Sequence, residues 1–173
     1  MDTFIEICTA TPSDAGIISR IAERSIRVGC AAEHRNDPGI VAAWVRNNTF
    51  THIHPWLADP RLRLTVARLQ GRPVGVAMAS VSGRIAFCYV QPESFRRGVG
   101  EALVRDIEAW LRGRGVTRVR LNSTRTSCAF YRRLGFEQSS DAFAIGGVKA
   151  IAMHKPLIAP TAKVLAESKS LRG

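Results

Sequence analysis

The sequence has few cysteines, and their spacing is unlike that of a metal site. Its four cysteines, Cys8, Cys30, Cys88 and Cys128, lie far apart and form no C-x-x-C pair. Structural zinc sites are usually built from closely spaced cysteines and histidines. We therefore expect no metal site, and we interpret the cysteines as buried free thiols in a reducing compartment.

Long apolar runs are also missing. A helix that spans a bilayer needs about 20 predominantly apolar residues, and no uninterrupted apolar stretch comes near that length. Residues 1–6 include acidic side chains where a secretory signal has a basic start and an apolar run. We expect a cytoplasmic protein with no membrane association, either a monomer or a small oligomer such as a homodimer.

Lysine is scarce, although the chain is strongly basic. The 25 Lys and Arg residues are nearly all arginine, and with 14 Asp and Glu they give a formal net charge of +11. The planar guanidinium of arginine matches phosphate oxygens, and a positive field attracts polyanions in general. The arginines are dispersed along the chain and do not alternate with aromatic residues as they do in proteins that stack nucleic-acid bases. We therefore do not expect a nucleic-acid partner.

Length and composition favour a single globular domain. The chain has 173 residues, of which 46% are hydrophobic and 23% charged, close to the averages for soluble domains. The patterned part ends near Leu157. We predict one domain over residues 1–157 and a polar C-terminal tail over residues 158–173.

Hydrophobic periodicity predicts a mixed α/β domain. A strand near residues 4–8 precedes two helices, one after Thr11-Pro12 and one from Pro38. Residues 47–60, with two histidines, two prolines and a tryptophan, are predicted to be a long irregular connection. The remaining predicted elements are strands at 62–66, 74–81 and 84–90, a helix after residue 100, a strand at 116–122, a helix at 127–134, and strands at 142–145 and 148–153.

A glycine turn joins the strand at 84–90 to the following helix. After Pro92 the chain reads Arg96-Arg97-Gly98-Val99-Gly100 and then enters the helix directly. The first amides of a helix lack internal partners and lie at the positive end of its dipole, so they favour anions. By itself this turn says little, because glycine at such a position often serves only the backbone geometry. Neither a P-loop nor a Rossmann fingerprint fits it.

A longer pattern around this turn resembles a known family, the GNAT superfamily of N-acetyltransferases. The central motif of that family is similar to Tyr89-Val90-Gln91-Pro92-Glu93 followed by Arg96-Arg97-Gly98-Val99-Gly100-Glu101-Ala102-Leu103. A later motif is similar to Leu121-Asn122-Ser123-Thr124, Ser127, Ala129 and Phe130-Tyr131-Arg132-Arg133-Leu134-Gly135-Phe136, and a frequent end of the last strand to Met153-His154-Lys155-Pro156-Leu157. The likeness covers residues 4–157. Phe95 departs from it, since the family usually carries Gln or Arg there.

The resemblance implies an α/β fold with a mixed, mostly antiparallel twisted sheet of about six to seven strands, flanked by about four helices. It also implies acetyl-CoA as cosubstrate, with the pyrophosphate at the glycine turn and the pantetheine between the strands at 84–90 and 116–122. The implied cofactor-binding residues are Cys88, Tyr89, Val90, Phe95, Arg96, Arg97, Gly98, Val99, Gly100, Glu101, Asn122 and Ala129.

Acetyl transfer needs an acid for the leaving thiolate and a base for the amine. Tyr131 maps onto the tyrosine that many family members use as this acid, and a phenol is protonated at neutral pH. The strand at 84–90 contains no Asp, Glu or His, although family members often place a carboxylate there. His52 and His54 are our candidates for the base, because imidazole titrates near neutral pH. Water is an alternative relay. A ping-pong reaction through Cys88 is less favoured than direct transfer.

These observations predict an acetyl-CoA-dependent N-acetyltransferase whose acceptor is a primary amine, with a small molecule preferred. By resemblance, residues 33–59 line the acceptor side, where Trp44 and Trp56 suggest an amphipathic pocket. Few acidic residues there argue against polycationic acceptors. Two alternatives stay open: acetylation of a protein N-terminus or lysine, and a module that binds acetyl-CoA without turnover.

Overall fold

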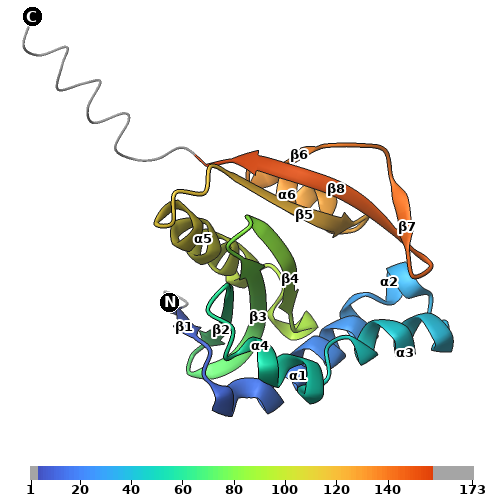
Figure 1. Cartoon of the computed structure of the whole chain (residues 1–173). Coiled ribbons are helices and arrows are strands. Elements are labelled where there is room, and N and C mark those ends of the chain that lie inside the picture. Colours follow the sequence, from blue (N-terminus) through green and yellow to red (C-terminus); the bar gives the residue numbers. More distant parts are fainter. Residues whose placement is uncertain (1–3, 158–173) are drawn as a thin grey trace, which may run out of the picture.

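The computed structural model describes residues 4–157, in which eight strands form one sheet (Figure 1). Neighbouring strands are antiparallel except for β4 and β5, which are parallel. The predicted mixed, mostly antiparallel α/β fold is confirmed, with eight strands instead of six or seven. In spatial order the strands are β1 (Ile5–Thr9), β2 (Leu62–Leu69), β3 (Arg72–Ser80), β4 (Arg84–Val90), β5 (Arg118–Thr124), β8 (Val148–Pro156) and β6 (Glu137–Gln138), while β7 (Phe143–Ile145) pairs with another part of β8.

Helices cover both faces of the sheet. The longest helix, α5 (Val99–Arg112), packs with α6 (Cys128–Arg133) on one face, where they share a core with the sheet. On the other face α1 (Ala15–Arg24) and α4 (Phe50–Trp56) enclose a second core. A π-helical turn (Ser25–Gly29) extends α1, and α2 (Ala31–His34) and α3 (Pro38–Arg46) follow it. Short 3-10 turns at Pro12–Asp14 and Pro92–Ser94 precede α1 and α5.

Two ion pairs hold α5 against the sheet beyond its apolar stripe. The guanidinium of Arg63 on β2 donates to both carboxylate oxygens of Asp106, each at 3.0 Å. On the other side Lys155 of β8 donates to Glu108, with Nζ and Oε1 2.9 Å apart, and Glu108 is almost completely buried. Because these pairs reach strands on either side of β4, they fix how the C-terminal half of α5 lies across the sheet.

The prediction that residues 47–60 form an irregular connection is wrong in one respect, because these residues contain α4. Ile53 of this helix is fully buried, and the Trp56 ring lies 6.4 Å from the Phe87 ring on the sheet. Short helices draw most of their stability from such packing, which the local sequence does not reveal. The four-residue α2 and the two-residue β6 were also not predicted.

Two other expectations concern the ends of the chain and the membrane. The predicted polar tail, residues 158–173, lies outside the described residues. Within residues 4–157, no helix combines the length and apolarity that crossing a membrane requires.

The buried Glu108–Lys155 pair predicts a large loss of stability when only one partner is removed. Lys155→Met leaves the Glu108 carboxylate buried with only Arg112 near it, at 3.6 Å. We expect the free energy of unfolding to fall by about 3 kcal/mol, as for other broken buried pairs. Urea denaturation measures this change.

Arg105→Met is the matched control, because Arg105 forms an exposed pair with Glu101 one turn away on α5. Exposed pairs of this kind contribute about 0.5 kcal/mol or less. Equal losses in the two variants would contradict the role given to Glu108 and Lys155.

Candidate functional site

Strands β4 and β5 meet at one point and then separate. The only residues in register between these two strands are Arg84 and Arg120. Next to this pair, the backbone amide of Arg120 donates a hydrogen bond to the Gly83 carbonyl, with N and O 2.9 Å apart. Beyond this point, within residues 4–157, the edge of β4 that faces β5 has no strand partner. Such an edge offers unpaired amides and carbonyls to an extended ligand. Figure 1 shows the two strands running apart.

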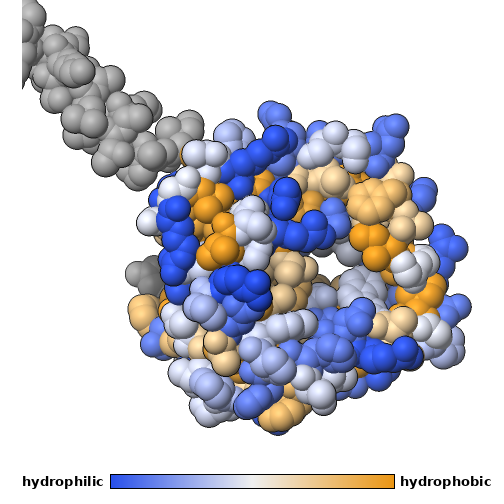
Figure 2. All heavy atoms as spheres, viewed as in Figure 1, coloured by the Kyte–Doolittle hydropathy of each residue, from blue (hydrophilic) through white to orange (hydrophobic). Residues whose placement is uncertain are grey.

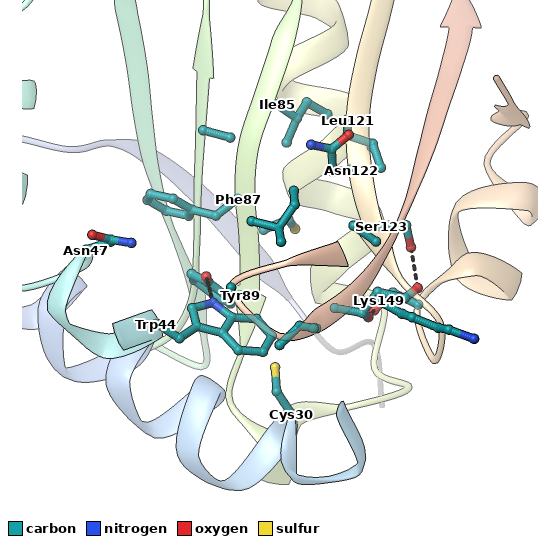
Figure 3. A pocket seen from close by; sticks show the side chains of 18 of the residues that line it. Cys30, Trp44, Asn47, Ile85, Phe87, Tyr89, Leu121, Asn122, Ser123 and Lys149 are labelled. Atoms are coloured by element: carbon teal, nitrogen blue, oxygen red, sulfur yellow. Dashed lines mark hydrogen bonds between the residues drawn. The ribbon is translucent and has the colours of Figure 1, made fainter. Parts of the chain in front are cut away.

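A cavity of about 350 Å³ lies at this separation (Figure 3). Strands β4 and β5 form two of its walls, and α3, the turn before α2, α6 and the β7–β8 hairpin supply the others. Its lining residues are Cys30, Ile40, Ala43, Trp44, Asn47, Arg84, Ile85, Ala86, Phe87, Cys88, Tyr89, Leu121, Asn122, Ser123, Thr124, Ser127, Tyr131, Ile145, Gly146, Val148, Lys149 and Ala150.

One face of α3 and the tip of the β7–β8 hairpin close the cavity together. Ile40, Ala43, Trp44 and Asn47 follow helical spacing, so they share that face. A Cβ at Gly147, whose φ is +82°, would lie 3.0 Å from Cδ1 of Ile40. Glycine is favoured here, because its φ would strain another residue and because the missing side chain lets the hairpin approach the helix closely.

Aromatic side chains form the wall of the cavity on the α3 side. The Trp44 indole donates to the Tyr89 hydroxyl at 2.9 Å, and the rings of Phe87 and Tyr89 stack 5.2 Å apart (Figure 3). The charged residues of the lining are Arg84 and Lys149. No Asp or Glu lines the cavity in the described part of the chain. The cavity is thus amphipathic and carries positive charge only.

Tyr131 of α6 lines the cavity from the opposite side. Its ring packs edge-on against Phe130 and Phe136, at centroid distances of 5.0 and 5.5 Å. Burial, with smaller contributions from Cys88 and Tyr89, raises the pKa of Tyr131 well above 10. The phenol therefore stays protonated at neutral pH and is able to donate a proton into the cavity.

Two thiols also line the cavity. Burial raises the pKa of Cys88 to about 12, and burial together with the nearby Glu33 carboxylate raises that of Cys30 to about 11. A thiol acts as a nucleophile only as the thiolate. Both thiols are therefore protonated and unreactive near neutral pH.

The glycine turn lies between the 3-10 turn that follows β4 and the start of α5, and its residues Phe95 to Gly98 are exposed. Arg96 and Gly98 both adopt the left-handed region, with φ of 60° and 82°, and Gly98 caps α5 without any side-chain hydrogen bond. The first amides of α5 are therefore available to an anion. A Cβ at Gly100 would lie 3.0 Å from Cζ of Phe130, so glycine allows α6 to approach the start of α5.

The predicted cofactor-binding residues separate into two groups. Cys88, Tyr89 and Asn122 line the cavity. The other predicted residues lie outside the lining. Phe95, Arg96 and Arg97 are exposed side chains of the turn, and Ala129 is exposed on α6. Val90, Gly98, Val99, Gly100 and Glu101 complete this second group at the end of β4 and the start of α5.

The two predicted histidines do not reach the cavity. His52 and His54 are exposed on α4, where His52 shares a hydrogen bond with the Thr49 hydroxyl at 2.9 Å and His54 stacks on Phe50. Their role as general base stays a prediction that this position does not support.

Several cavity residues escaped the sequence-based prediction. Ser123 and Thr124 come directly after Asn122 on β5, so a longer predicted strand would have included them. Cys30 and Lys149 carry no local signal, because only the folding of the first helices and of the last hairpin brings them together.

Comparisons with known proteins agree on one family. The model of the acetyltransferase (GNAT) family matches residues 29–136. An aminoglycoside N(6')-acetyltransferase type 1 from Klebsiella aerogenes is 36% identical over 84 residues, covering 42% of this chain and 55% of that protein. A Bacillus subtilis protein, YyaT, is 28% identical over 93 residues, covering 51% and 62%. The chain thus spans about three-fifths of the length of these relatives.

Solved structures share the fold at low sequence identity. A GCN5-related N-acetyltransferase from Rhodopseudomonas palustris superimposes with a TM-score of 0.79 at 23% identity, over 91% of this chain and 99% of that one. The PaiA N-acetyltransferase of Thermoplasma acidophilum, solved in complex with coenzyme A, gives 0.76 at 17% identity, over 88% and 99%.

The raised pKa of Cys88 predicts slow alkylation. At pH 8 a thiol of pKa about 12 has about 1000-fold less thiolate than one with the ordinary value of 9. We expect iodoacetamide to label Cys88 far more slowly than free cysteine, and the rate to rise with pH. Peptide mass spectrometry over time measures it. Cys8, which has the same intermediate exposure, serves as an internal reference, and labelling of Cys88 ahead of Cys8 at pH 8 would contradict the inert-thiol assignment.

Proposed function

Because the chain belongs to the GNAT family of acetyltransferases, we propose that it transfers the acetyl group of acetyl-CoA directly to the primary amine of a small molecule. The observation that carries this proposal is the cavity between β4 and β5, which combines an unpaired strand edge with the buried, protonated phenol of Tyr131.

On the donor side, the pyrophosphate of acetyl-CoA would bind at the amides that begin α5. The positive end of a helix dipole and free amides favour a phosphate, and the exposed Arg96 and Arg97 add charge at the rim. The pantetheine would extend along the open edge of β4 and bond to its backbone. The turn and the open edge follow one another along the chain, so one extended molecule is able to occupy both.

In the transfer itself, the neutral amine would attack the thioester carbonyl, and the carbon–sulfur bond would break as the tetrahedral intermediate collapses. Amides of β4 near Cys88 would stabilise the oxyanion. Tyr131 would give its proton to the departing sulfur, and the amine would lose its proton to water. Direct transfer fits the two protonated thiols, because neither Cys30 nor Cys88 is available as an acyl carrier at neutral pH.

On the acceptor side, the shape and charge of the cavity favour a small molecule over a polycation. The β7–β8 hairpin and α3 close the cavity, so the acceptor and the thioester end of acetyl-CoA would share about 350 Å³. Arg84 and Lys149 are its charged residues, and they would repel a polyamine. The Klebsiella relative is an aminoglycoside acetyltransferase, but the charge of this cavity argues against such an acceptor here.

The acid role of Tyr131 predicts a selective loss of turnover. Tyr131→Phe keeps the ring packing against Phe130 and Phe136 and removes only the hydroxyl. We expect kcat to fall by about 100-fold or more, in the range found for lost general acids, with the Kd of acetyl-CoA changed less than about twofold. Steady-state CoA release and calorimetric titration measure the two effects.

Tyr89→Phe is the matched control, because it removes the other phenol of the cavity, which accepts a hydrogen bond from Trp44. We expect this variant to change KM for the amine more than kcat. A Tyr131→Phe enzyme with near-normal kcat would rule out the acid assignment.

A CoA-release assay over a panel of primary amines tests the function as a whole. Release of free thiol with at least one amine, together with the mass of the acetylated product, is the expected result. Tight binding of acetyl-CoA with no release for any amine or peptide would favour a module that binds acetyl-CoA without turnover. Release with peptides alone would favour a protein acceptor.

A further inference from the structure

Arginine side chains gather on the sheet where β4 and β5 meet. Arg84 of β4 is in register with Arg120 of β5, and Arg120 is in register with His154 of β8. Residues paired in this way project from the same face of a sheet. Arg118 lies two residues before Arg120 and therefore shares its face, and both are exposed while Val119 and Leu121 between and after them are buried.

This row borders a depression of about 390 Å³ that adjoins the cavity. Arg84, Leu121 and Asn122 line both. The Ser139 hydroxyl contacts Nδ1 of His154 at 2.6 Å and adds a polar group to the lining. Figure 2 shows hydrophilic residues gathered over β5 and over the end of the β3–β4 hairpin, beside the hollow in this face. The remaining lining residues are Arg118, Arg120, Ala152 and Met153.

The charges of this row are not balanced within the described residues. No Asp or Glu lines the depression over residues 4–157, and Arg84, Arg118 and Arg120 form no ion pair there. Glu137 of β6 is in register with His154 on the edge of β8 that faces away from β5, and it does not line the depression. Like charges directly opposite each other in a sheet are destabilising. An anion bound between them would remove that repulsion.

We propose that this arginine row, defined as Arg84, Arg118 and Arg120, binds a carboxylate or phosphate group of the acceptor. The inference rests on the proposed function, because it requires the acceptor amine to lie in the adjoining cavity. Arginine binds both kinds of anion through two parallel N–H···O bonds. The acceptor is then an amine that also carries an anionic group.

The geometry also sets the shape of this acceptor. Arg84 precedes Cys88 by four residues on β4, which separates their Cα atoms by roughly 13 Å in a strand. The amine at the Tyr131 end and the anion at the Arg84 end are therefore at opposite ends of an elongated molecule. A free α-amino acid such as glycine is too short to reach both.

Matched pairs of amines test the inference through CoA release. The pairs are 8-aminooctanoate with octylamine, and 6-aminohexyl phosphate with hexylamine; glycine is the short control. We expect kcat/KM to be about 10-fold or more higher for the anionic member of at least one pair, as for other charge-assisted contacts. Comparing the two pairs distinguishes carboxylate from phosphate. Equal kcat/KM within both pairs would overturn the inference.

The double variant Arg118→Gln/Arg120→Gln tests the assigned residues. It should abolish the preference through KM, with kcat/KM for the neutral amines unchanged within about twofold. The matched control, Arg72→Gln/Arg133→Gln, removes two exposed charges elsewhere and should keep the preference. A preference that survives in the first variant would overturn the assignment. Should that variant fail to fold, Arg84→Gln tests the same row from β4.

A binding measurement separates this inference from the proposed function. With its CoA site saturated with CoA, the protein is titrated calorimetrically with inorganic phosphate and with acetate. Binding of either anion that weakens about 10-fold or more in the double variant supports the arginine row even if no amine releases CoA. Equal affinity in both proteins would overturn it. Binding of a single-stranded oligonucleotide that is lost in the double variant, without any preference among the amines, would assign the row to nucleic acid instead.

Discussion

The single point of contact between β4 and β5 is the constraint on which the rest of the structure depends. Two parallel strands in adjacent positions would normally pair along their whole length, yet here only Arg84 and Arg120 are in register. The absence of strand pairing beyond that point has three consequences. The edge of β4 stays open, the cavity occupies the gap, and side chains from both strands face the same space. A continuous ladder would leave no room for a ligand to reach the backbone of β4.

Tight packing on both sides of the sheet keeps this gap open. On one side, ion pairs from Asp106 to β2 and from Glu108 to β8 hold α5 across the sheet. Gly100 lets α6 approach the N-terminus of α5, and α6 in turn places Tyr131 in the cavity. On the other side, Gly147 lets the last hairpin close over α3. The open strand edge thus lies inside a packed frame, where a ligand meets groups that are already in position.

Burial and charge divide the chemistry of the site among its residues. Burial raises the pKa of Tyr131, Cys88 and Cys30 alike, so the phenol and both thiols are neutral at physiological pH. A raised pKa keeps the phenol protonated, so it is able to act as an acid. The same shift keeps a thiol protonated, so it is not a nucleophile. The fixed charges of the lining are positive, which leaves the site suited to an acceptor that brings negative charge of its own.

The amino-acid sequence by itself determined most elements and the family, because both depend on local patterns. The alternation of side chains predicted the strand at 84–90, and helical spacing together with the glycine turn predicted α5. The motif around Tyr131 and Gly135-Phe136 identified the family. The same patterns led to Cys88, Tyr89, Asn122 and Tyr131, which line the cavity. Only the tertiary structure decided the helical state of residues 50–56, the distance of His52 and His54 from the cavity, and the contributions of Cys30 and Lys149. It also aligned Arg84 with Arg120 and His154, residues more than thirty positions apart in the chain. These features depend on strand register and on packing between distant segments, and neither can be predicted from the local sequence.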